Sequence, residues 1–331
     1  MRLAPLTALL PAALLLALGT GPGAVGVGEA LQTIGAHLGL TAPTPGLRDA
    51  IVWELRLPRA LLAALVGAAL ASAGVLTQGL FRNPLADPGI LGVSAGAMLA
   101  AVIGFMFGAE QHGLWVTPLL AAGGAALVLL VLLALHRARQ SLATLLLSGF
   151  ALGTLCAAVA TLCLAFGAQR WDLGIRVMQW SLGSFEGRTW IHLAWAIPPC
   201  VIGLALATWL RRDLDTLHLG HDIAASLGVD LGRLRRHVVL AVGLLVGAAT
   251  ALSGVIGFVG LLVPHLARMI AGPGHRRLLP LAALLGALLL VLVDTLARAV
   301  TRIVLPPGVL TSLLGAPLFL WMLRRRELGE R

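Results

Sequence analysis

The stretch WVTPLLAAGGAALVLLVLLAL, residues 115–135, decides the fold class. It contains no charged side chain, and a helix of roughly 20 such residues is long enough to cross the hydrocarbon core of a membrane. Further apolar segments lie on both sides of it, at 91–107 toward the N-terminus and at 142–167 toward the C-terminus. The sequence therefore predicts an all-α integral membrane protein.

Apolar segments continue to both ends of the chain and predict ten transmembrane helices per protomer. The others are an N-terminal segment that runs to about residue 28, and then 59–80, 190–210, 238–252, 259–271, 278–298 and 308–323. The N-terminal segment also resembles a secretory signal, but no soluble domain follows it, so a retained helix is favoured. We expect a single transmembrane domain that spans residues 1–331.

The distribution of charge orients these helices. All 24 basic residues are arginine; with the N-terminus inside, 16 fall on cytoplasmic loops and tails and eight fall outside. Basic residues mark cytoplasmic loops, so both termini are predicted to be cytoplasmic. Topology also explains the net charge of +10, because no soluble basic domain is present to bind nucleic acid. We expect membrane lipid, and no nucleic acid, around the chain.

The absence of lysine excludes a P-loop, whose lysine must reach the β- and γ-phosphates of ATP. If ATP drives this protein, another chain binds it. We therefore expect no enzymatic activity, no catalytic residue and no resident metal. Cys156, Cys163 and Cys200 lie in apolar segments without a CxxC pair, and we interpret them as packing residues.

Two loops are predicted to contain short helices. The longest cytoplasmic loop, residues 211–237, contains a short helix that Asp222 is expected to cap and Gly228 to end. On the outside, residues 171–182 are amphipathic and are expected to lie at the periplasmic surface. In addition, segments 74–84 and 254–265 break apolar runs at comparable places in halves of opposite orientation, which indicates an inverted repeat.

Several motifs carry a family resemblance. They are RLPR at 56–59, FRNPLADPGILGV at 81–93, GVIGFVGLLVPHLAR at 254–268, LPPGV at 305–309 and LGAPLF at 314–319. With them the chain resembles the permeases of type II ABC importers, the FecCD-like family that carries iron–siderophores, heme and cobalamin. The resemblance covers nearly the whole chain, from about Arg56 to Trp321.

That resemblance implies an assembly in the bacterial inner membrane. The permease would be a homodimer of ten-helix protomers around a central pathway, with two cytoplasmic ATP-binding subunits and a periplasmic substrate-binding protein. ATP and Mg²⁺ would bind on the ATPase partner, and the permease would hold no covalently bound cofactor. A short coupling helix would turn nucleotide-driven motion of the ATPase into movement of the membrane helices.

The resemblance also assigns roles by position. The coupling positions, which enter a cleft of the ATPase in the family, are Gly220, His221, Asp222, Ala224, Leu227 and Gly228. The positions of the cytoplasmic gate are Asn83, Leu85, Leu142 and Ala143, of which the last two match polar residues in the cobalamin relative. Irregular backbone at a membrane boundary, as Pro84 imposes, survives where it faces protein or a water-filled path.

Three arginines match positions that meet acidic residues of the binding protein in the cobalamin relative. They are Arg56, Arg59 and Arg298. A planar guanidinium offers a bidentate fork to a carboxylate on the docked partner. The alternative is pairing within the chain, of Glu54 with Arg56 or of Asp294 with Arg298 one helical turn away.

The cargo is inferred from charge near the external mouth and from one short segment. Heme carries two propionates that arginines near the external mouth could attract, and segment 180–188 resembles heme permeases slightly better than cobalamin permeases. We interpret heme as the cargo, with ferric siderophore and cobalamin as alternatives. Candidate pathway residues are Ser148, Thr154, Arg176, Met178 and Arg188. Whether a histidine or methionine ligates a metal in transit stays open.

An ion-coupled secondary transporter is the alternative of another class. Such a transporter would show several acids at mid-depth in its helices. In this sequence Asp294 is the main acid inside a predicted span, and it lies near the outer end. The ATP-driven interpretation is therefore preferred.

Overall fold

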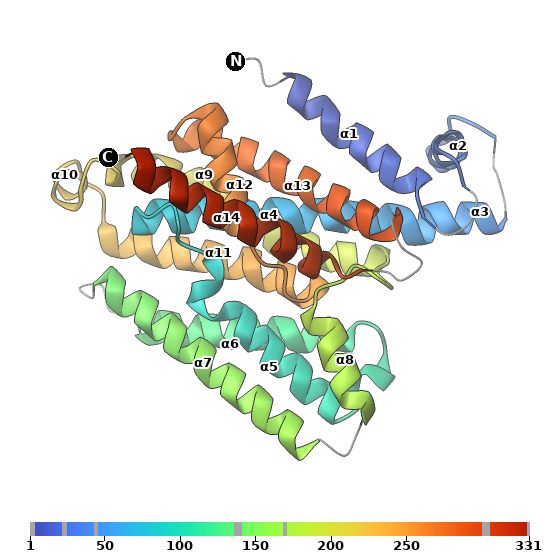
Figure 1. The fold of residues 1–331 in the computed structure, drawn as a ribbon, viewed down its shortest axis with the longest axis horizontal. Helices are drawn as coiled ribbons and strands as arrows, with labels where there is room; N and C mark the ends of the chain where they lie inside the picture. The colour runs from blue at the N-terminus through green and yellow to red at the C-terminus, as the bar shows by residue number, and fades with distance from the viewer. Residues whose placement is uncertain are drawn as a thin grey trace.

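The computed structural model describes residues 4–21, 25–42, 46–135, 141–167, 171–299 and 305–329. Every regular element in those ranges is helical, which confirms the all-α prediction (Figure 1). In chain order the elements are α1 (Ala4–Gly19), α2 (Val27–His37), α3 (Leu47–Ala50), the π-helical η1 (Ile51–Arg56), α4 (Leu57–Phe81), the 3₁₀ turn η2 (Pro88–Leu91), α5 (Val93–Met106), the 3₁₀ turn η3 (Ala109–His112), α6 (Val116–Leu135), α7 (Leu142–Phe166), α8 (Trp171–Ser181), α9 (Trp190–Leu217), α10 (His221–Ser226), α11 (Leu231–Ser253), α12 (Val259–Ala271), α13 (His275–Ala299) and α14 (Pro307–Gly329). Four arginines counted for orientation, Arg2, Arg137, Arg139 and Arg331, lie outside the described residues.

Six helical segments are long and apolar enough to cross a membrane. They are the continuous run from α3 through α4, and α6, α7, α9, α11 and α13. Shorter apolar helices, α1, α5, α12 and α14, occupy the other predicted spans. With 14 and 13 residues, α5 and α12 are shorter than a hydrocarbon core of about 30 Å, since a helix rises about 1.5 Å per residue. Ten crossings therefore remain a prediction.

The N-terminal helix is shorter than expected. It ends at Gly19 rather than near residue 28, and Val27 begins a separate helix, α2. Gly21 follows with a φ of 124°, a backbone conformation that glycine adopts readily and that does not continue a right-handed helix.

The buried centre of the molecule is formed by α4, α11 and α13. Helices α4 and α13 approach so closely that a Cβ on Gly67 would overlap the backbone of Gly286. Helices α4 and α12 meet in the same way at Gly74 and Gly260. Small residues at such crossings let backbones pack directly against one another in a membrane protein. Helices α4 and α13 are therefore held in direct backbone contact.

Helix α7 lies at the edge of the bundle (Figure 1). It exposes a row of large apolar side chains, Leu147, Phe150, Leu155, Leu162 and Phe166. In a membrane protein such a face contacts lipid or another subunit.

The two breaks that suggested an inverted repeat differ in detail. In the first half, α4 ends before Asn83 and Pro84. In the second half, Gly254 ends α11, whereas Pro264 lies inside α12 and does not interrupt it. The breaks are therefore not equivalent residue by residue, and the repeat stays a prediction.

Candidate functional site

Helix α10 lies in the connection between α9 and α11, and glycines fix both of its ends. Gly220 precedes it with a φ of 125°, and Gly228 follows it with a φ of 87°. Residues other than glycine rarely adopt these values. At its end the amides of Gly228 and Val229 donate to the carbonyls of Ala225 and Ala224. These bonds satisfy carbonyls that a helix end otherwise leaves without a partner. Gly228 thus ends the helix, as the sequence predicted.

The predicted cap at the start of α10 is wrong. Asp222 lies inside the first turn, and the capping position belongs to Gly220, which has no side chain to accept a hydrogen bond. The exposed carboxylate of Asp222 still favours the helix, because the N-terminus carries a positive partial charge. His221, half-buried, is the first residue of the helix.

The two faces of α10 are opposite in character. Ala224 is fully buried within its own chain, so it does not offer the close contact with a partner that the sequence had assigned to it. Leu219, Ile223 and Leu227 are exposed, by 61%, 50% and 63%. We call these three side chains the α10 apolar face. Clustered exposed apolar side chains next to a structured helix are typical of a docking surface.

Residues 83–85 contain two of the predicted gate positions and begin one residue after α4 ends; we call this segment the gate loop. Arg82 ends the helix in the left-handed region, with a φ of 49°. The amide of Asn83 then donates to the carbonyl of Gln78 at 3.2 Å, and the side-chain oxygen of Asn83 accepts from the amide of Leu85 at 2.9 Å. Asn83 therefore fixes the loop by bonding on both sides of Pro84, which has no amide hydrogen to donate.

The start of α7 is the other predicted gate element. The hydroxyl of Ser141 caps it by accepting from the amide of Thr144 at 3.1 Å. Leu142 is half-buried and Ala143 is exposed. Within the described part of the chain, no hydrogen bond or ion pair joins Leu142 or Ala143 to the gate loop. A single chain thus shows the two gate elements as separate segments.

The hydroxyl groups predicted to line a pathway on α7 have different environments. Ser148 is half-buried. Thr154 is exposed, and its hydroxyl donates to the carbonyl of Ala151 at 2.9 Å, the back-bonding that competes with a pathway role.

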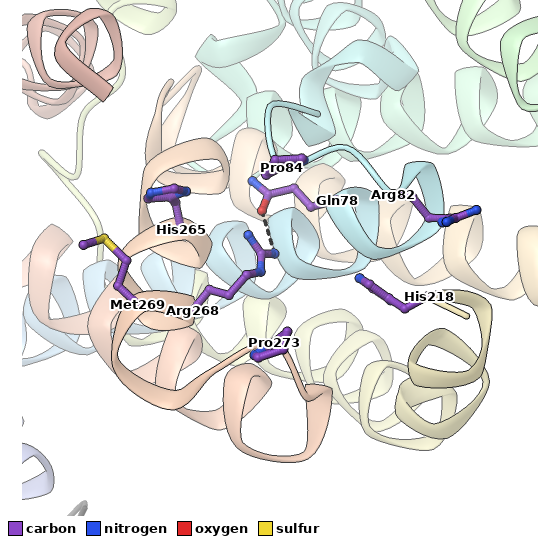
Figure 2. A pocket seen from close by; sticks show the side chains of 8 residues that line it. All are labelled: Gln78, Arg82, Pro84, His218, His265, Arg268, Met269 and Pro273. Atoms are coloured by element: carbon purple, nitrogen blue, oxygen red, sulfur yellow. Dashed lines mark hydrogen bonds between the residues drawn. The ribbon is translucent and has the colours of Figure 1, made fainter. Parts of the chain in front are cut away.

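A pocket of about 370 Å³ opens beside the gate loop (Figure 2). It lies between the end of α4, the end of α9 and α12, and it is lined by Gln78, Arg82, Pro84, His218, His265, Arg268, Met269 and Pro273. Arg268 donates to the side-chain oxygen of Gln78 at 3.0 Å, and the side-chain Nε2 of Gln78 donates to the carbonyl of Leu261 at 3.1 Å. These bonds tie α12 to α4 at the base of the gate loop. Several helices end here, and the nearby cations balance the negative partial charge of their C-termini.

The opposite ends of α4 and α13 are held by a buried ion cluster, which we define as Arg56, Arg59, Asp294 and Arg298. Arg59 binds the carboxylate of Asp294 with two nitrogens, at 2.8 and 3.0 Å, and Arg298 approaches it to 3.3 Å. The pairing of Asp294 with Arg298 is the alternative that the sequence left open. No hydrogen bond or ion pair between Glu54 and Arg56 is seen in the described chain.

The same cluster holds the end of α1. Arg56 donates to the carbonyls of Leu18 and Gly21, and Arg298 donates to those of Ala17 and Thr20. These carbonyls close a helix and have no partner within it, so the guanidinium groups satisfy them and balance the helix dipole. All three arginines therefore bond inside the chain, and only a small part of their surface is exposed.

The arginines proposed to attract cargo are also engaged or buried. Arg176 pairs with Glu110 and Asp172, so its charge is already neutralised within the chain. Burial lowers the pKa of Arg188 to about 10, and its Nε has no hydrogen-bond partner within the described residues. Met178 is exposed on α8, which lies in the segment where a short external helix was predicted.

Sequence reasoning missed four residues at the α10 end of the molecule. Gln78 and Arg268 join α4 to α12, and Asp215 and His275 join α9 to α13 at 2.6 Å. The signal available in the sequence was a polar residue at the very end of an apolar helix. That signal does not say which helix end lies beside which.

Comparisons with known proteins agree with this architecture. The sequence profile of the FecCD transport family matches residues 9–325. A vitamin B12 import system permease protein, BtuC, of Vibrio cholerae is 48% identical over 286 residues, which cover 85% of each chain. The BtuC of Salmonella typhi is 41% identical over 276 residues, 83% of this chain and 84% of that protein.

A solved structure described as an inward-facing conformation of a metal-chelate type ABC transporter is also similar. It is 32% identical, with a TM-score of 0.85 over 98% of both chains. The bundle of apolar helices, the exposed short helix and these matches define a permease of the ABC importer class, a transporter subunit without a catalytic role of its own. The chain belongs to the FecCD transport family.

These findings bear on two interpretations of the sequence. The ion-coupled secondary transporter is not supported, because the family is that of ABC importer permeases. The preference for heme is not supported either, because the similar proteins are vitamin B12 permeases, which favours the cobalamin alternative. The slight similarity of segment 180–188 to heme permeases was too short a signal to outweigh the rest of the chain.

Proposed function

We propose that this chain is the membrane permease of an ATP-driven importer of cobalamin. The observation that carries the proposal is 48% identity with a vitamin B12 import permease over most of both chains. The permease works as a homodimer in the bacterial inner membrane, with ten crossings per protomer and both termini in the cytoplasm. Two ATP-binding subunits and a periplasmic binding protein complete the importer, and ATP with Mg²⁺ binds on the ATPase.

Features of the single chain support this assembly. The exposed apolar row on α7 suits contact with a second copy around a shared pathway. The α10 apolar face suits a cleft in the ATPase, so Leu219 and Ile223 join Leu227 as docking contacts, while Gly220 and Gly228 shape the helix. Residues of the gate loop close the pathway on the cytoplasmic side.

The ion cluster is proposed to lie at the periplasmic end. The cluster contains three guanidinium groups and one carboxylate, and this excess of positive charge would attract an acidic binding protein. Because the arginines bond inside the chain, they act on the partner through their net charge more than through bidentate contacts. Association should therefore weaken as salt rises.

Uptake in cells tests the proposal directly. Cells that lack their own cobalamin permease receive this chain with its ATPase and binding protein, and labelled cobalamin is offered. We expect ATP-dependent accumulation, with no competition from excess heme or ferric siderophore. Accumulation of heme or siderophore without cobalamin would assign another cargo.

A further inference from the structure

Asp215 joins two helices close to α10. It lies in the last turn of α9, six positions before His221, where α10 begins. Its carboxylate accepts from the backbone amide of His275 at 2.9 Å and from the ring Nδ1 of His275 at 2.6 Å. His275 is the first residue of α13, so the carboxylate also caps a helix end that carries a positive partial charge. The Asp215 side chain thus fixes both the start of α13 and the orientation of the His275 ring.

The other edge of the His275 ring faces α4. A Cβ added to Gly79 would lie 2.7 Å from Nε2, so only glycine leaves room for the ring. Nε2 is buried and has no hydrogen-bond partner within the described residues, although an unsatisfied buried nitrogen lowers stability. The ring cannot turn to find a partner, because Nδ1 is committed to Asp215. His275 is therefore a fixed wedge between α9 and α4.

Gly79 lies in the last turn of α4, next to the gate loop. Its carbonyl accepts from the amide of Arg82 at 3.3 Å, one residue before Asn83. The ring of His218, which follows α9, lies 5.3 Å from the His275 ring, and His218 and Arg82 line the same pocket (Figure 2). A continuous series of contacts thus runs from the connection to α10, through the Asp215–His275 pair, to the gate loop.

We infer that Asp215 and His275 are positioning residues that couple displacement of α10 to the gate loop. The inference rests on the proposed function, in which an ATPase moves α10. When α10 moves, the last turn of α9 moves with it, Asp215 carries His275, and the ring displaces the final turn of α4. The pair is rigid because it is short and its ring is buried, with His275 only 2% exposed. Simple capping of α13 would need neither the wedge nor the glycine opposite it.

Coupling is measured as cobalamin taken up per ATP hydrolysed. The permease, its ATPase and its binding protein are reconstituted in proteoliposomes, and both quantities are recorded on the same vesicles. In Asp215→Ala and His275→Ala we expect uptake per ATP to fall at least about tenfold, with hydrolysis within about twofold of the wild type. The matched control is Asp213→Ala, on the same helix, because Asp213 makes no hydrogen bond or ion pair within the described chain. Wild-type uptake per ATP in the first two variants would overturn the inference.

A conservative variant separates coupling from capping. His275→Asn keeps an amide donor near the position of Nδ1 but does not reach Gly79. Because the cap of α13 is kept, we expect the thermal midpoint of His275→Asn to equal that of the wild type, while its uptake per ATP is as low as in His275→Ala. Full recovery of uptake would show that capping alone matters. In the double variant Asp215→Ala with His275→Ala, uptake per ATP should equal that of the more impaired single variant, because both changes remove the same contact. A loss equal to the product of the two single losses would contradict a shared contact.

A substitute variant and a wild-type control complete the experiment. If His275→Ala does not assemble, Gly79→Ala replaces it, since its methyl presses on Nε2 and leaves Asp215 bonded. Reduced uptake per ATP supports the inference, and wild-type uptake contradicts it. Failure of the proposed function would appear in wild-type vesicles, as absence of ATP-dependent cobalamin uptake. Failure of the inference appears only in the variants, so the two outcomes are distinguishable.

Discussion

The two ends of the bundle are built on different principles. At the end of α1, the ion cluster ties α1, α4 and α13 together with a buried bidentate ion pair and four bonds to helix carbonyls. At the end of α10, helices stop around an open pocket, and a partly exposed carboxylate, Asp215, connects α9 to α13. One end is cross-linked by charge, whereas the other is held by a few short contacts beside an exposed helix.

The difference indicates where the molecule moves. Breaking a buried ion pair leaves uncompensated charges in the interior, so the ion cluster resists rearrangement. Helix α10 has a glycine at each end, and the gate loop follows Arg82, whose φ is in the left-handed region; such irregular backbone absorbs changes in φ and ψ at a lower cost. We therefore expect the α1 end to act as a fixed platform and the α10 end to rearrange during transport.

The largest effect is expected at the platform. Asp294→Ala removes the carboxylate that Arg59 and Arg298 share, and leaves two buried guanidinium groups without it. Loss of one partner of a buried ion pair costs about 3–5 kcal/mol. Thermal unfolding in detergent should show a large fall in midpoint, and Asp294→Asn, which keeps an acceptor oxygen, should be intermediate. A wild-type midpoint in the alanine variant would mean that the cluster does not hold this end.

An intermediate effect is expected on the α10 apolar face. Ile223→Arg places a charge where an apolar side chain would enter the ATPase cleft, so affinity for the ATPase should fall at least about tenfold, or ~1.4 kcal/mol. The midpoint of the permease should not change, because Ile223 is exposed. Ile223→Leu serves as the control and should bind normally. Unchanged affinity of the arginine variant, measured by titration in detergent, would place the docking surface elsewhere.

The smallest effect is expected at an exposed ion pair. Asp172 bonds to Arg176 on the surface of α8, and Arg176 keeps Glu110 as a second partner. Exposed pairs contribute about 0–1 kcal/mol, so Asp172→Ala should change the free energy of unfolding by less than about 1 kcal/mol. A loss as large as that of Asp294→Ala would remove the distinction between buried and exposed charge in this molecule.

Much of the fold could be predicted from the sequence because long apolar runs admit few structures in a membrane. A helix occupies each predicted span, and Gly228 ends α10 as its backbone freedom requires. Local chemistry alone misassigned Asp222, because a carboxylate in a first turn and one at a cap look alike in sequence.

Contacts between distant segments could not be predicted in the same way. Ala224 looked available to a partner, yet the fold buries it, and Asp215 lies 60 positions from His275. The helix ends that meet are set by how the helices pack. That packing is set in turn by close crossings, such as that of α4 and α13 at Gly67 and Gly286. The heme interpretation rested on the similarity of one short segment, whereas similarity over most of the chain favours cobalamin.

Crosslinking at the gate loop tests most directly the claim that the α10 end rearranges in a dimer. In a background where Cys156, Cys163 and Cys200 are replaced by serine, Leu85→Cys introduces one thiol per protomer at the loop that Asn83 shapes. In the proposed homodimer, the two copies of this loop would meet at the two-fold axis, because the contact is isologous. We predict efficient disulfide formation across the dimer in the resting state, blocked cobalamin uptake once it forms, and a different yield when ATP binds. Absence of crosslinking in every nucleotide state, with the dimer intact, would contradict the account.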